Sequence, residues 1–316
     1  IKLCPLIRHF RENLPWLATR VCVTAQHREL LDQVLPVFDV QPDYDLDVMR
    51  PGQTLAAASG RILAALEPVL AAERPDLVFV QGDTTTTLCG ALAAFYARIP
   101  VAHVEAGLRT GDMSQPFPEE MNRVLAGRLS ALHFAATQRA AHNLCREGVP
   151  GHAIHITGNT GIDAVLQVSE RLSGGALRGR DWPALDPRKH WILVTAHRRE
   201  SFGDGFERLC SALLKLAERS DVQIVYPVHP NPNVTEPVQR HLAGRRNIAL
   251  VEPLDYVSFV DLMRRAYLIL TDSGGVQEEA PALGRPVLVL RDETERPEAV
   301  TIGANLLVGT NTGRIL

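Results

Sequence analysis

Short apolar runs alternate along the chain with longer segments of helical periodicity. The runs are rich in Val, Ile and Leu and do not alternate with polar residues, which is typical of strands buried on both faces of a parallel sheet. They predict two series of strands. The first series is 20–24, 77–81, 101–105, 132–135 and 154–157, and the second is 192–195, 223–227, 248–251, 268–271 and 287–290.

Between these runs, apolar side chains recur every three or four residues, as they do on one face of a helix. The spacing predicts helices at 53–72, 88–97, 140–147, 206–219 and 258–267. Strands that alternate with helices favour right-handed crossovers and parallel pairing. We therefore expect an α/β fold with parallel sheets.

The series is interrupted after Leu172 by a stretch rich in Gly, Pro and charged residues, which is typical of a linker. This stretch predicts two α/β domains, 1–172 and 173–316, each of ordinary size. Open α/β sheets bind ligands at the carboxyl ends of their strands. We therefore expect the functional residues at those ends, and the ligand in a cleft between the two domains.

Composition indicates an ordered protein that neither binds nucleic acid nor spans a membrane. The 316 residues are 46% hydrophobic and carry a formal net charge of −3. These values argue against disorder and against nucleic-acid binding, which needs clustered Lys and Arg. No apolar run approaches the ~18–20 residues of a membrane span, because Glu67 and Pro68 interrupt 63–72. No secretory signal opens the chain, so we expect a cytoplasmic protein.

The five cysteines are scattered, odd in number and without CxxC spacing, so they predict neither a disulfide framework nor a zinc site. Most lie among apolar residues, as Cys22 does, and are expected to be small buried hydrophobic side chains in a reducing compartment. The chain opens with Ile1 instead of Met. We therefore expect further residues before Ile1 and after Leu316.

The strand predicted at 77–81 runs into the polar sequence Gly82-Asp83-Thr84. One interpretation is that Asp83 or Thr84 caps the helix that follows, which suits their side-chain oxygens. The other is that this helix start receives an anionic or sugar group. The two interpretations are compatible.

Glu105 ends the next predicted strand, where a carboxylate is costly unless it is paired or used in chemistry. The structural interpretation is a buried ion pair with Arg109. Glu119 and Glu120 follow Pro118 at the start of another helix, where acidic residues favour helix initiation by themselves. Helix initiation therefore explains at least one of these two glutamates.

In the second half, three basic residues, His197, Arg198 and Arg199, follow a predicted strand. They suit a diphosphate, to which Arg donates bidentate hydrogen bonds, although a solvated loop is the alternative. His229 follows the next strand in a Pro-rich turn and is more often structural in such a place.

The last strand-end motif is Ser273-Gly274-Gly275, between a predicted strand and a helix start. Glycines permit close backbone approach, and exposed N–H groups at a helix start hold phosphate. The motif is neither the Rossmann glycine pattern nor a P-loop, because it lacks the spacing of the first and the Lys of the second.

The ordered set of motifs resembles the bacterial non-hydrolysing UDP-N-acetylglucosamine 2-epimerases. The matching segments are QGDTTTT at 81–87, HVEAGLRT at 103–110, PFPEEMNR at 116–123, TGNTGIDA at 157–164, TAHRRESFG at 195–203, YPVHPNPNV at 226–234, TDSGGVQEEAPALGRPVLVLRDETERPEA at 271–299 and VGT at 308–310. The likeness extends over essentially the whole chain. It implies a glycosyltransferase-B-like pair of Rossmann-type domains with the active site between them.

The resemblance implies reversible conversion of UDP-N-acetylglucosamine to UDP-N-acetylmannosamine without a cofactor or metal. The family reaction is anti-elimination of UDP to a 2-acetamidoglucal, followed by re-addition. Because the C2 hydrogen is barely acidic, one carboxylate must remove it and another acid must return a proton to the opposite face. Motif positions assign this proton traffic to Asp83, Glu105 and Glu119, and assistance to the departing diphosphate to His197.

The resemblance also implies a UDP site and a homodimer formed through the first domain. In that site Arg198 is a charge clamp, Ser273, Gly274 and Gly275 form the phosphate turn, and Glu279 contacts the ribose. Phe259 matches a residue near the uracil, although a helix-core role is its alternative. Further substrate-binding matches are Lys2, Arg123, His229 and Arg296.

The chain departs from the family pattern in several places. The Gly-Thr-Arg-Pro-Glu loop that precedes Ile1-Lys2 in the family is absent, as is the C-terminal helix. Many members are activated by UDP-N-acetylglucosamine in a second site, to which Gln26, His27 and Glu29 correspond. Glu29, and Gly52 where an Arg is common, lead us to expect weaker dependence on that activator.

Three alternatives stay open at the level of the sequence. The first is the hydrolysing relative, which releases UDP and N-acetylmannosamine. The second is a retaining glycosyltransferase of the same fold, which does not need three carboxylates. The third is a catalytically inactive nucleotide-sugar sensor.

Overall fold

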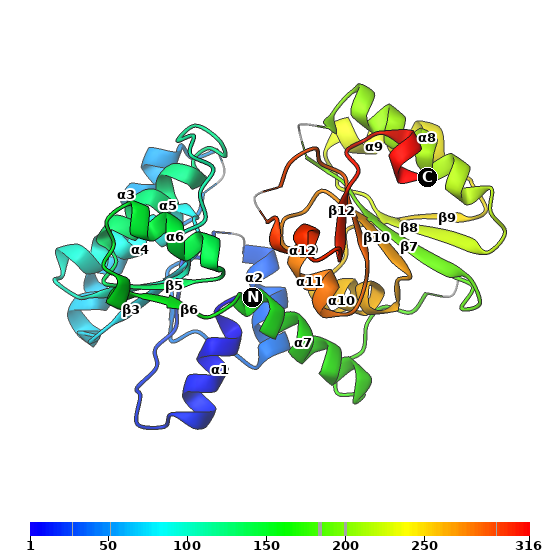
Figure 1. Ribbon diagram of the computed structural model, residues 1–316. Coiled ribbons are helices and arrows are strands. Elements are labelled where there is room, and N and C mark those ends of the chain that lie inside the picture. Colours follow the sequence, from blue (N-terminus) through cyan, green and yellow to red (C-terminus); the bar gives the residue numbers. More distant parts are fainter. Residues whose placement is uncertain (27, 51, 183–184, 199–200, 295) are drawn as a thin grey trace. The chain divides into compact units, whose positions relative to one another are not determined.

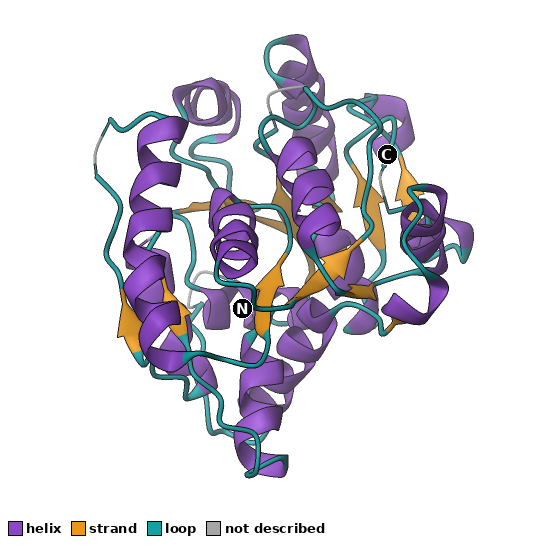
Figure 2. Cartoon of the chain, turned by 90° about the vertical axis from the view of Figure 1, so that its left-hand side faces the viewer, coloured by secondary structure: helices purple, strands orange, loops and turns teal. Residues whose placement is uncertain are grey.

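The computed structural model describes residues 1–316 except 27, 51, 183–184, 199–200 and 295 (Figure 1). The chain divides into two compact units, Ile1–Thr160 and Gly161–Leu316. In each unit, helices pack against a parallel sheet (Figure 2). The predicted fold class, an α/β fold with two Rossmann-like domains, is confirmed.

The first unit contains a four-stranded parallel sheet in the order β3-β4-β5-β6 and a separate parallel pair, β1-β2. The strands are β1 (Cys22–Val23), β2 (Tyr44–Asp45), β3 (Val78–Gln81), β4 (Val101–Ala106), β5 (Leu132–Ala135) and β6 (Ile154–Ile156). The helices are α1 (Cys4–Asn13), α2 (Arg28–Val34), η1 (Leu35–Phe38), α3 (Leu55–Glu73), α4 (Thr85–Tyr96), α5 (Glu119–Leu129), α6 (Gln138–Arg146) and η2 (Gly151–Ala153).

The second unit contains a six-stranded parallel sheet in the order β12-β11-β10-β7-β8-β9. Its strands are β7 (His190–Thr195), β8 (Val222–Pro227), β9 (Ile248–Val251), β10 (Leu268–Thr271), β11 (Val287–Val289) and β12 (Asn305–Leu307). Its helices are α7 (Thr160–Ser173), α8 (Asp204–Ala217), α9 (Pro232–Leu242), α10 (Tyr256–Arg265), α11 (Val276–Ala282), α12 (Glu298–Thr301) and α13 (Thr312–Ile315).

This strand order is that of a doubly wound sheet, in which the chain order reverses between two neighbouring strands. Here those strands are β7 and β10, which pair with Thr195 opposite Thr271. Connections leave such a switch point on opposite sides, so the loops that follow the two strands diverge and leave room for a ligand. The loops after β7 and β10 carry two of the motifs found in the sequence.

All ten predicted strands overlap observed strands, and all five predicted helices overlap observed helices. Two strands, β2 and β12, were missed: β2 has no buried residue, and β12 is an edge strand with one buried residue, so neither gives a buried apolar run. The predicted domain boundary after Leu172 falls at the end of α7. The residues that follow pack on the second unit, where the Arg180 amide donates to Ser258 Oγ and the Asp186 amide donates to Gln223 Oε1.

The expectation that most cysteines are buried is wrong in part. Cys4, Cys89 and Cys210 are buried, but Cys22 and Cys145 are exposed. Cys22 lies in a strand of two residues whose sheet has only one partner strand, so its apolar neighbours do not imply burial.

Pro68 does not interrupt the apolar segment, because α3 continues through it. By length and composition, α3 is long and apolar enough to cross a membrane. In this structure Ala58, Ile62 and Leu66 of α3 are buried in the first unit.

Candidate active site

Five of the residues singled out from the sequence form a cluster in the first unit. We call it the carboxylate cluster; its members are Lys2, Asp83, Glu105, Glu119 and Arg123. Burial raises the pKa of Asp83, and Glu105 and Glu119 raise it further, whereas Arg123 and Lys2 lower it. Lys2 pairs with Glu105 at 2.5 Å and Arg123 with Asp83 at 2.6 Å, and Glu119 lies near enough for its charge to raise the pKa of Asp83.

Asp83 lies at the carboxyl end of β3 and is not the helix cap. Thr84 is the N-cap of α4, because its Oγ1 accepts a hydrogen bond from the Thr87 amide. The Asp83 carboxylate instead accepts a 2.6 Å hydrogen bond from Arg123 Nη2. Asn122 holds the same loop through a 2.8 Å bond from its Nδ2 to the Asp83 carbonyl. Thr84 therefore caps α4, whereas the side chain of the adjacent Asp83 belongs to the carboxylate cluster.

Glu105 occupies a strained position at the end of β4. Its φ is 61°, in the left-handed region, and the register of β4 against β5 shifts between Val104 and Ala106. Such a conformation costs of order 1–3 kcal/mol in a residue other than glycine and is concentrated at functional sites. The bulge turns the Glu105 side chain out of the strand's regular alternation.

The partners of Glu105 differ from the predicted one. Lys2 Nζ lies 2.5 Å from its carboxylate, Gln81 Nε2 donates to it at 2.6 Å and Asn159 Nδ2 at 3.2 Å. Arg109 is paired with Glu147 at 2.7 Å, so the proposed Glu105–Arg109 ion pair is wrong. A carboxylate held by a cation and by side-chain amides is oriented and compensated in charge.

The two glutamates at the start of α5 have different roles. Glu120 is buried, with an exposed fraction of 1%, and its Oε1 accepts hydrogen bonds from the amides of Thr110 and Gly111 at 3.0 Å. Its Oε2 lies 3.3 Å from Arg123 Nη1. Glu120 therefore fixes a loop and Arg123, while Glu119 remains with the carboxylate cluster. The family resemblance assigned Glu119 to the site, but the role of Glu120 in fixing the loop was not predicted.

His103 was not singled out from the sequence, although it lies beside the cluster. It is fully buried in β4, and its Nε2 is 2.8 Å from the Gly82 carbonyl, next to Asp83. A carbonyl only accepts, so Nε2 carries the hydrogen. Burial is the main reason that the pKa of His103 falls to about 4.

In the second unit, the loops after β7 and β10 are joined by one buried carboxylate. Asp272 follows β10, and its Oδ2 accepts hydrogen bonds from the amides of His197 and Arg198 at 2.7 and 2.8 Å. Arg198 Nε also donates to the Asp272 carbonyl at 3.1 Å. The loop at 196–198 is thus anchored to its neighbour, unlike a simple solvated loop. Asp272 was missed, although a charged residue directly after a buried strand is a recognisable signal.

His197 stacks on a second histidine. The rings of His197 and His229 lie 5.3 Å apart at an interplanar angle of 11°. Burial and the neighbouring His197 lower the pKa of His229, and Asp272 raises it. Arg199, the third basic residue of the predicted motif, is outside the described residues.

The Ser-Gly-Gly turn lies on the same edge of the sheet. Thr271 Oγ1 accepts a 3.0 Å hydrogen bond from the Ser273 amide, and Gly274 is buried. A side chain at Gly275 would meet Glu279 Oε1 at 3.3 Å, so Glu279 lies against the turn. The structure therefore brings His197, Arg198, His229, the turn and Glu279 to one edge.

The remaining predicted residues have other surroundings. Arg296 forms an ion pair with Glu278. Phe259 is partly buried on α10. Gln26 accepts a 3.2 Å hydrogen bond from Thr86 of the first motif, and Glu29 is exposed on α2. His27 is outside the described residues.

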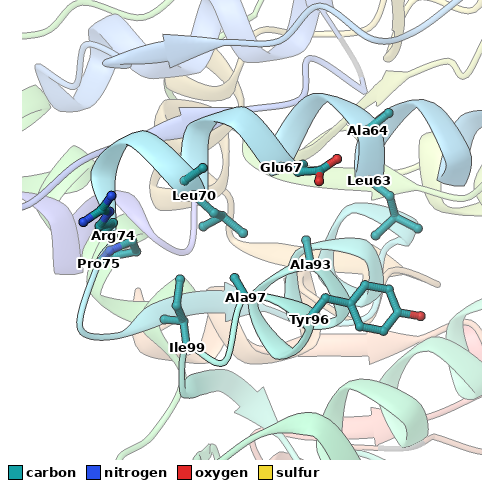
Figure 3. A pocket seen from close by; sticks show the side chains of 11 residues that line it. Leu63, Ala64, Glu67, Leu70, Arg74, Pro75, Ala93, Tyr96, Ala97 and Ile99 are labelled. Carbon is teal, nitrogen blue, oxygen red and sulfur yellow. The ribbon is translucent and has the colours of Figure 1, made fainter.

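The structure offers two further observations about ligand sites. Among the described residues, no group of three or more His, Cys, Asp or Glu side chains is placed to hold a metal ion. A cavity of about 760 Å³ lies between α3 and α4, lined by Leu63, Leu70 and Tyr96 among others (Figure 3). None of the described residues that line it belongs to a sequence motif, so it is separate from the carboxylate cluster.

Two Rossmann-like units with polar loops at the carboxyl ends of their strands define a glycosyltransferase-B-like α/β protein. The family described as UDP-N-acetylglucosamine 2-epimerase matches residues 11–316. The chain belongs to this family, as its motifs predicted.

Curated relatives carry the same name. The UDP-N-acetylglucosamine 2-epimerase of Yersinia pestis is 58% identical over 321 residues, and that of Escherichia coli strain K12 is 57% identical over the same length. Both alignments cover 100% of this chain and 85% of the relative.

Solved structures of UDP-GlcNAc 2-epimerases share the fold of this chain. UDP-GlcNAc 2-epimerase from Neisseria meningitidis, bound to UDP-GlcNAc, is 46% identical with a TM-score of 0.91, covering 99% of this chain and 85% of that one. The Methanocaldococcus jannaschii enzyme, in complex with UDP-GlcNAc and UDP, is 35% identical with a TM-score of 0.78, covering 99% and 87%. The fold is thus shared over almost the whole chain.

Proposed function

We propose that the chain converts UDP-N-acetylglucosamine reversibly to UDP-N-acetylmannosamine in the cytoplasm, without releasing free sugar. The observation that carries the proposal is the carboxylate cluster, in which Asp83, Glu105 and Glu119 share one site with two cations. A C2 epimerisation needs both a base and an acid around one sugar ring. Neither glycosyl transfer nor nucleotide binding alone needs three carboxylates.

The proposed reaction begins with removal of the C2 proton by a carboxylate of the cluster. The electron pair of the C2–H bond forms the C1–C2 double bond, the C1–O bond breaks, and its electron pair leaves with UDP. The product is 2-acetamidoglucal. Re-addition of UDP and protonation of C2 on the opposite face complete the conversion. The raised pKa of Asp83 supports an arrangement that holds an acid and a base at the same pH.

We assign UDP binding to the edge of the second sheet. The backbone N–H groups of Gly274 and Gly275 and the side chain of Ser273 suit the diphosphate, and Glu279 suits the ribose. His197 and Arg198 follow β7 at the topological switch point, where ligands of doubly wound sheets bind. Further assigned contacts are those of Lys2, Arg123, His229, Phe259 and Arg296.

The deciding experiment is proton NMR of UDP-N-acetylglucosamine in heavy water with the enzyme. We expect the manno epimer to form and deuterium to enter at C2 of both sugars. Free N-acetylmannosamine with UDP would instead assign the chain to hydrolysis. Binding of UDP without any turnover would assign it to nucleotide-sugar sensing.

We further propose that the protein is a homodimer through the first unit. The α3–α4 face supports this, because Phe95 and Tyr96 of α4 are 56% and 71% exposed and Tyr96 lines the cavity of Figure 3. Light scattering should report a dimer for the wild type and a monomer for Tyr96→Asp. Tyr267→Asp, which alters an exposed tyrosine of the second unit, is the matched control. A dimeric Tyr96→Asp variant would reject this face.

We also propose weak dependence on activation by UDP-N-acetylglucosamine. Gly52 has a φ of 68°, which disfavours the Arg that is common there in the family. Glu29 adds a negative charge on the exposed face of α2. The reverse reaction from UDP-N-acetylmannosamine alone should therefore be hyperbolic. An absolute requirement for added UDP-N-acetylglucosamine would remove the proposal.

A further inference from the structure

Asp272 is the most completely buried acid beside the proposed diphosphate site, with an exposed fraction of 0%. Burial of a carboxylate is expensive unless both oxygens are satisfied. Asp272 lies directly after β10, and its own amide donates to the Thr195 carbonyl at the end of β7. It thus lies at the switch point between the two strands (Figure 1).

The two oxygens of Asp272 have unequal surroundings. Oδ2 accepts the amides of His197 and Arg198, at 2.7 and 2.8 Å. Oδ1 is buried and has no hydrogen-bond partner among the described residues. The group facing it is the His197 imidazole, whose Nδ1 lies 3.4 Å away. A small rotation of that ring would give Oδ1 its missing donor.

This contact dictates where the hydrogens of His197 lie. An ionised carboxylate only accepts hydrogen bonds, so Nδ1 must carry a hydrogen for the contact to be favourable. Nε2, on the far side of the ring, is then the nitrogen left for a ligand. The His197 side chain is 43% exposed, so a ligand has access to it.

His229 stacks on the face of the His197 ring and favours the same orientation of that ring. Its Nδ1 accepts a 3.2 Å hydrogen bond from the Asn231 amide, so that nitrogen carries no hydrogen. Its ring lies nearly parallel to that of His197 and restricts tilting. His197 is therefore held by an acid at one edge, a ring at one face and its own anchored amide.

We propose that Asp272 is a positioning residue for the reaction proposed above, and that it acts through His197. It holds the imidazole with hydrogen on Nδ1 and balances the charge of the doubly protonated ring. In that ring Nε2–H donates to a phosphate oxygen as the C1–O bond breaks and its electron pair leaves with UDP. This inference rests on the proposed epimerase function and assigns a residue to it.

The test compares Asp272→Asn with His197→Ala and with the double variant. An amide at 272 keeps an oxygen for the two backbone N–H groups but turns an N–H towards Nδ1, which selects the wrong tautomer. We expect kcat to fall at least about 100-fold with KM for UDP-N-acetylglucosamine within about threefold. We expect no further loss when Asp272→Asn is added to His197→Ala, because groups that act as a unit are non-additive.

Asp261→Asn is the matched control, because Asp261 is also buried in the second unit but pairs with Arg264 and Arg265. Wild-type kcat in Asp272→Asn would overturn the inference. So would an equal loss in the His197→Ala background, since Asp272 would then act independently of His197.

A spectroscopic measurement keeps the inference testable if Asp272→Asn does not fold. In wild-type protein labelled with ¹⁵N-histidine, the His197 signals, identified by their loss in His197→Ala, should report hydrogen on Nδ1. Hydrogen on Nε2 alone would refute the pairing. This readout needs no turnover, so failure of the epimerase assay would reject the proposed function without deciding the fate of the His197–Asp272 pair.

Discussion

Replacing His103 should change how the stability of the protein depends on acid. Burial is the largest cause that lowers the pKa of His103 from 6.5 to about 4, and His133 and Arg109 lower it further. The Gly82 carbonyl and Glu105 oppose the shift. The ring is fully buried, and its Nδ1 has no hydrogen-bond partner among the described residues, so a proton on that atom would gain nothing.

The pKa shift of His103 fixes how its contribution to the free energy of unfolding depends on pH. Because the folded-state pKa lies below the unfolded value, the contribution of His103 to stability is complete above pH 6.5 and is lost as pH falls through about 4. The whole shift corresponds to about 3 kcal/mol, of which roughly 2 kcal/mol is lost between pH 7.5 and pH 5. His103→Gln keeps a donor for the Gly82 carbonyl but cannot titrate.

The assay is urea unfolding followed by circular dichroism at several pH values. The difference in free energy of unfolding between wild type and His103→Gln should shift by about 2 kcal/mol, in favour of the variant, from pH 7.5 to pH 5. His152→Gln, which removes an exposed histidine, should leave the pH dependence unchanged. Parallel curves for wild type and His103→Gln would refute the assignment of a buried neutral imidazole.

Three further substitutions test the first unit. Asp83→Asn should abolish turnover while leaving UDP affinity within about tenfold, or ~1.4 kcal/mol by calorimetry, because the diphosphate is assigned to other residues; wild-type-like turnover would contradict its catalytic role. Thr84→Ala should lower the free energy of unfolding by about 1 kcal/mol, because the cap of α4 is lost. Gly107→Ala should cost at least about 2 kcal/mol, because a Cβ there would collide with the Ala140 carbonyl. Gly148→Ala, at a similar φ of 85° but in open space, should cost less, and equal losses would reject the collision.

Much of the fold could be predicted because a strand buried on both faces leaves a continuous apolar run. The strands β7, β8 and β10 are such cases, and all three were found to within two residues at each end. Short elements such as β2 leave no such pattern. Its two residues pair with β1 through backbone hydrogen bonds, which any sequence can make.

The candidate site was predictable to the extent that motifs mark strand ends. The family resemblance assigned Glu119 and not Glu120 to the site, but the local sequence gives no physical reason for that choice, because it depends on tertiary contacts. Glu119 and Glu120 are neighbours in sequence, yet it is Glu120 that accepts hydrogen bonds from the backbone amides of a loop. The partner of Glu105 was unpredictable for the same reason. The bulge that gives Glu105 its φ of 61° turns it to Lys2, more than a hundred residues away, and leaves Arg109 to Glu147.

Two of the missed residues, Glu120 and Asp272, share one property that explains both their position and their importance. Glu120 and Asp272 are buried acids, and in each one carboxylate oxygen accepts hydrogen bonds from two backbone amides of a neighbouring loop. Buried carboxylates persist only where such donors compensate them. Each therefore acts as a fixed anchor for a neighbouring functional side chain, Arg123 for Glu120 and His197 for Asp272. If chemistry requires those two side chains to be held within a fraction of an ångström, then removing an anchor should lower kcat more than it weakens ligand binding.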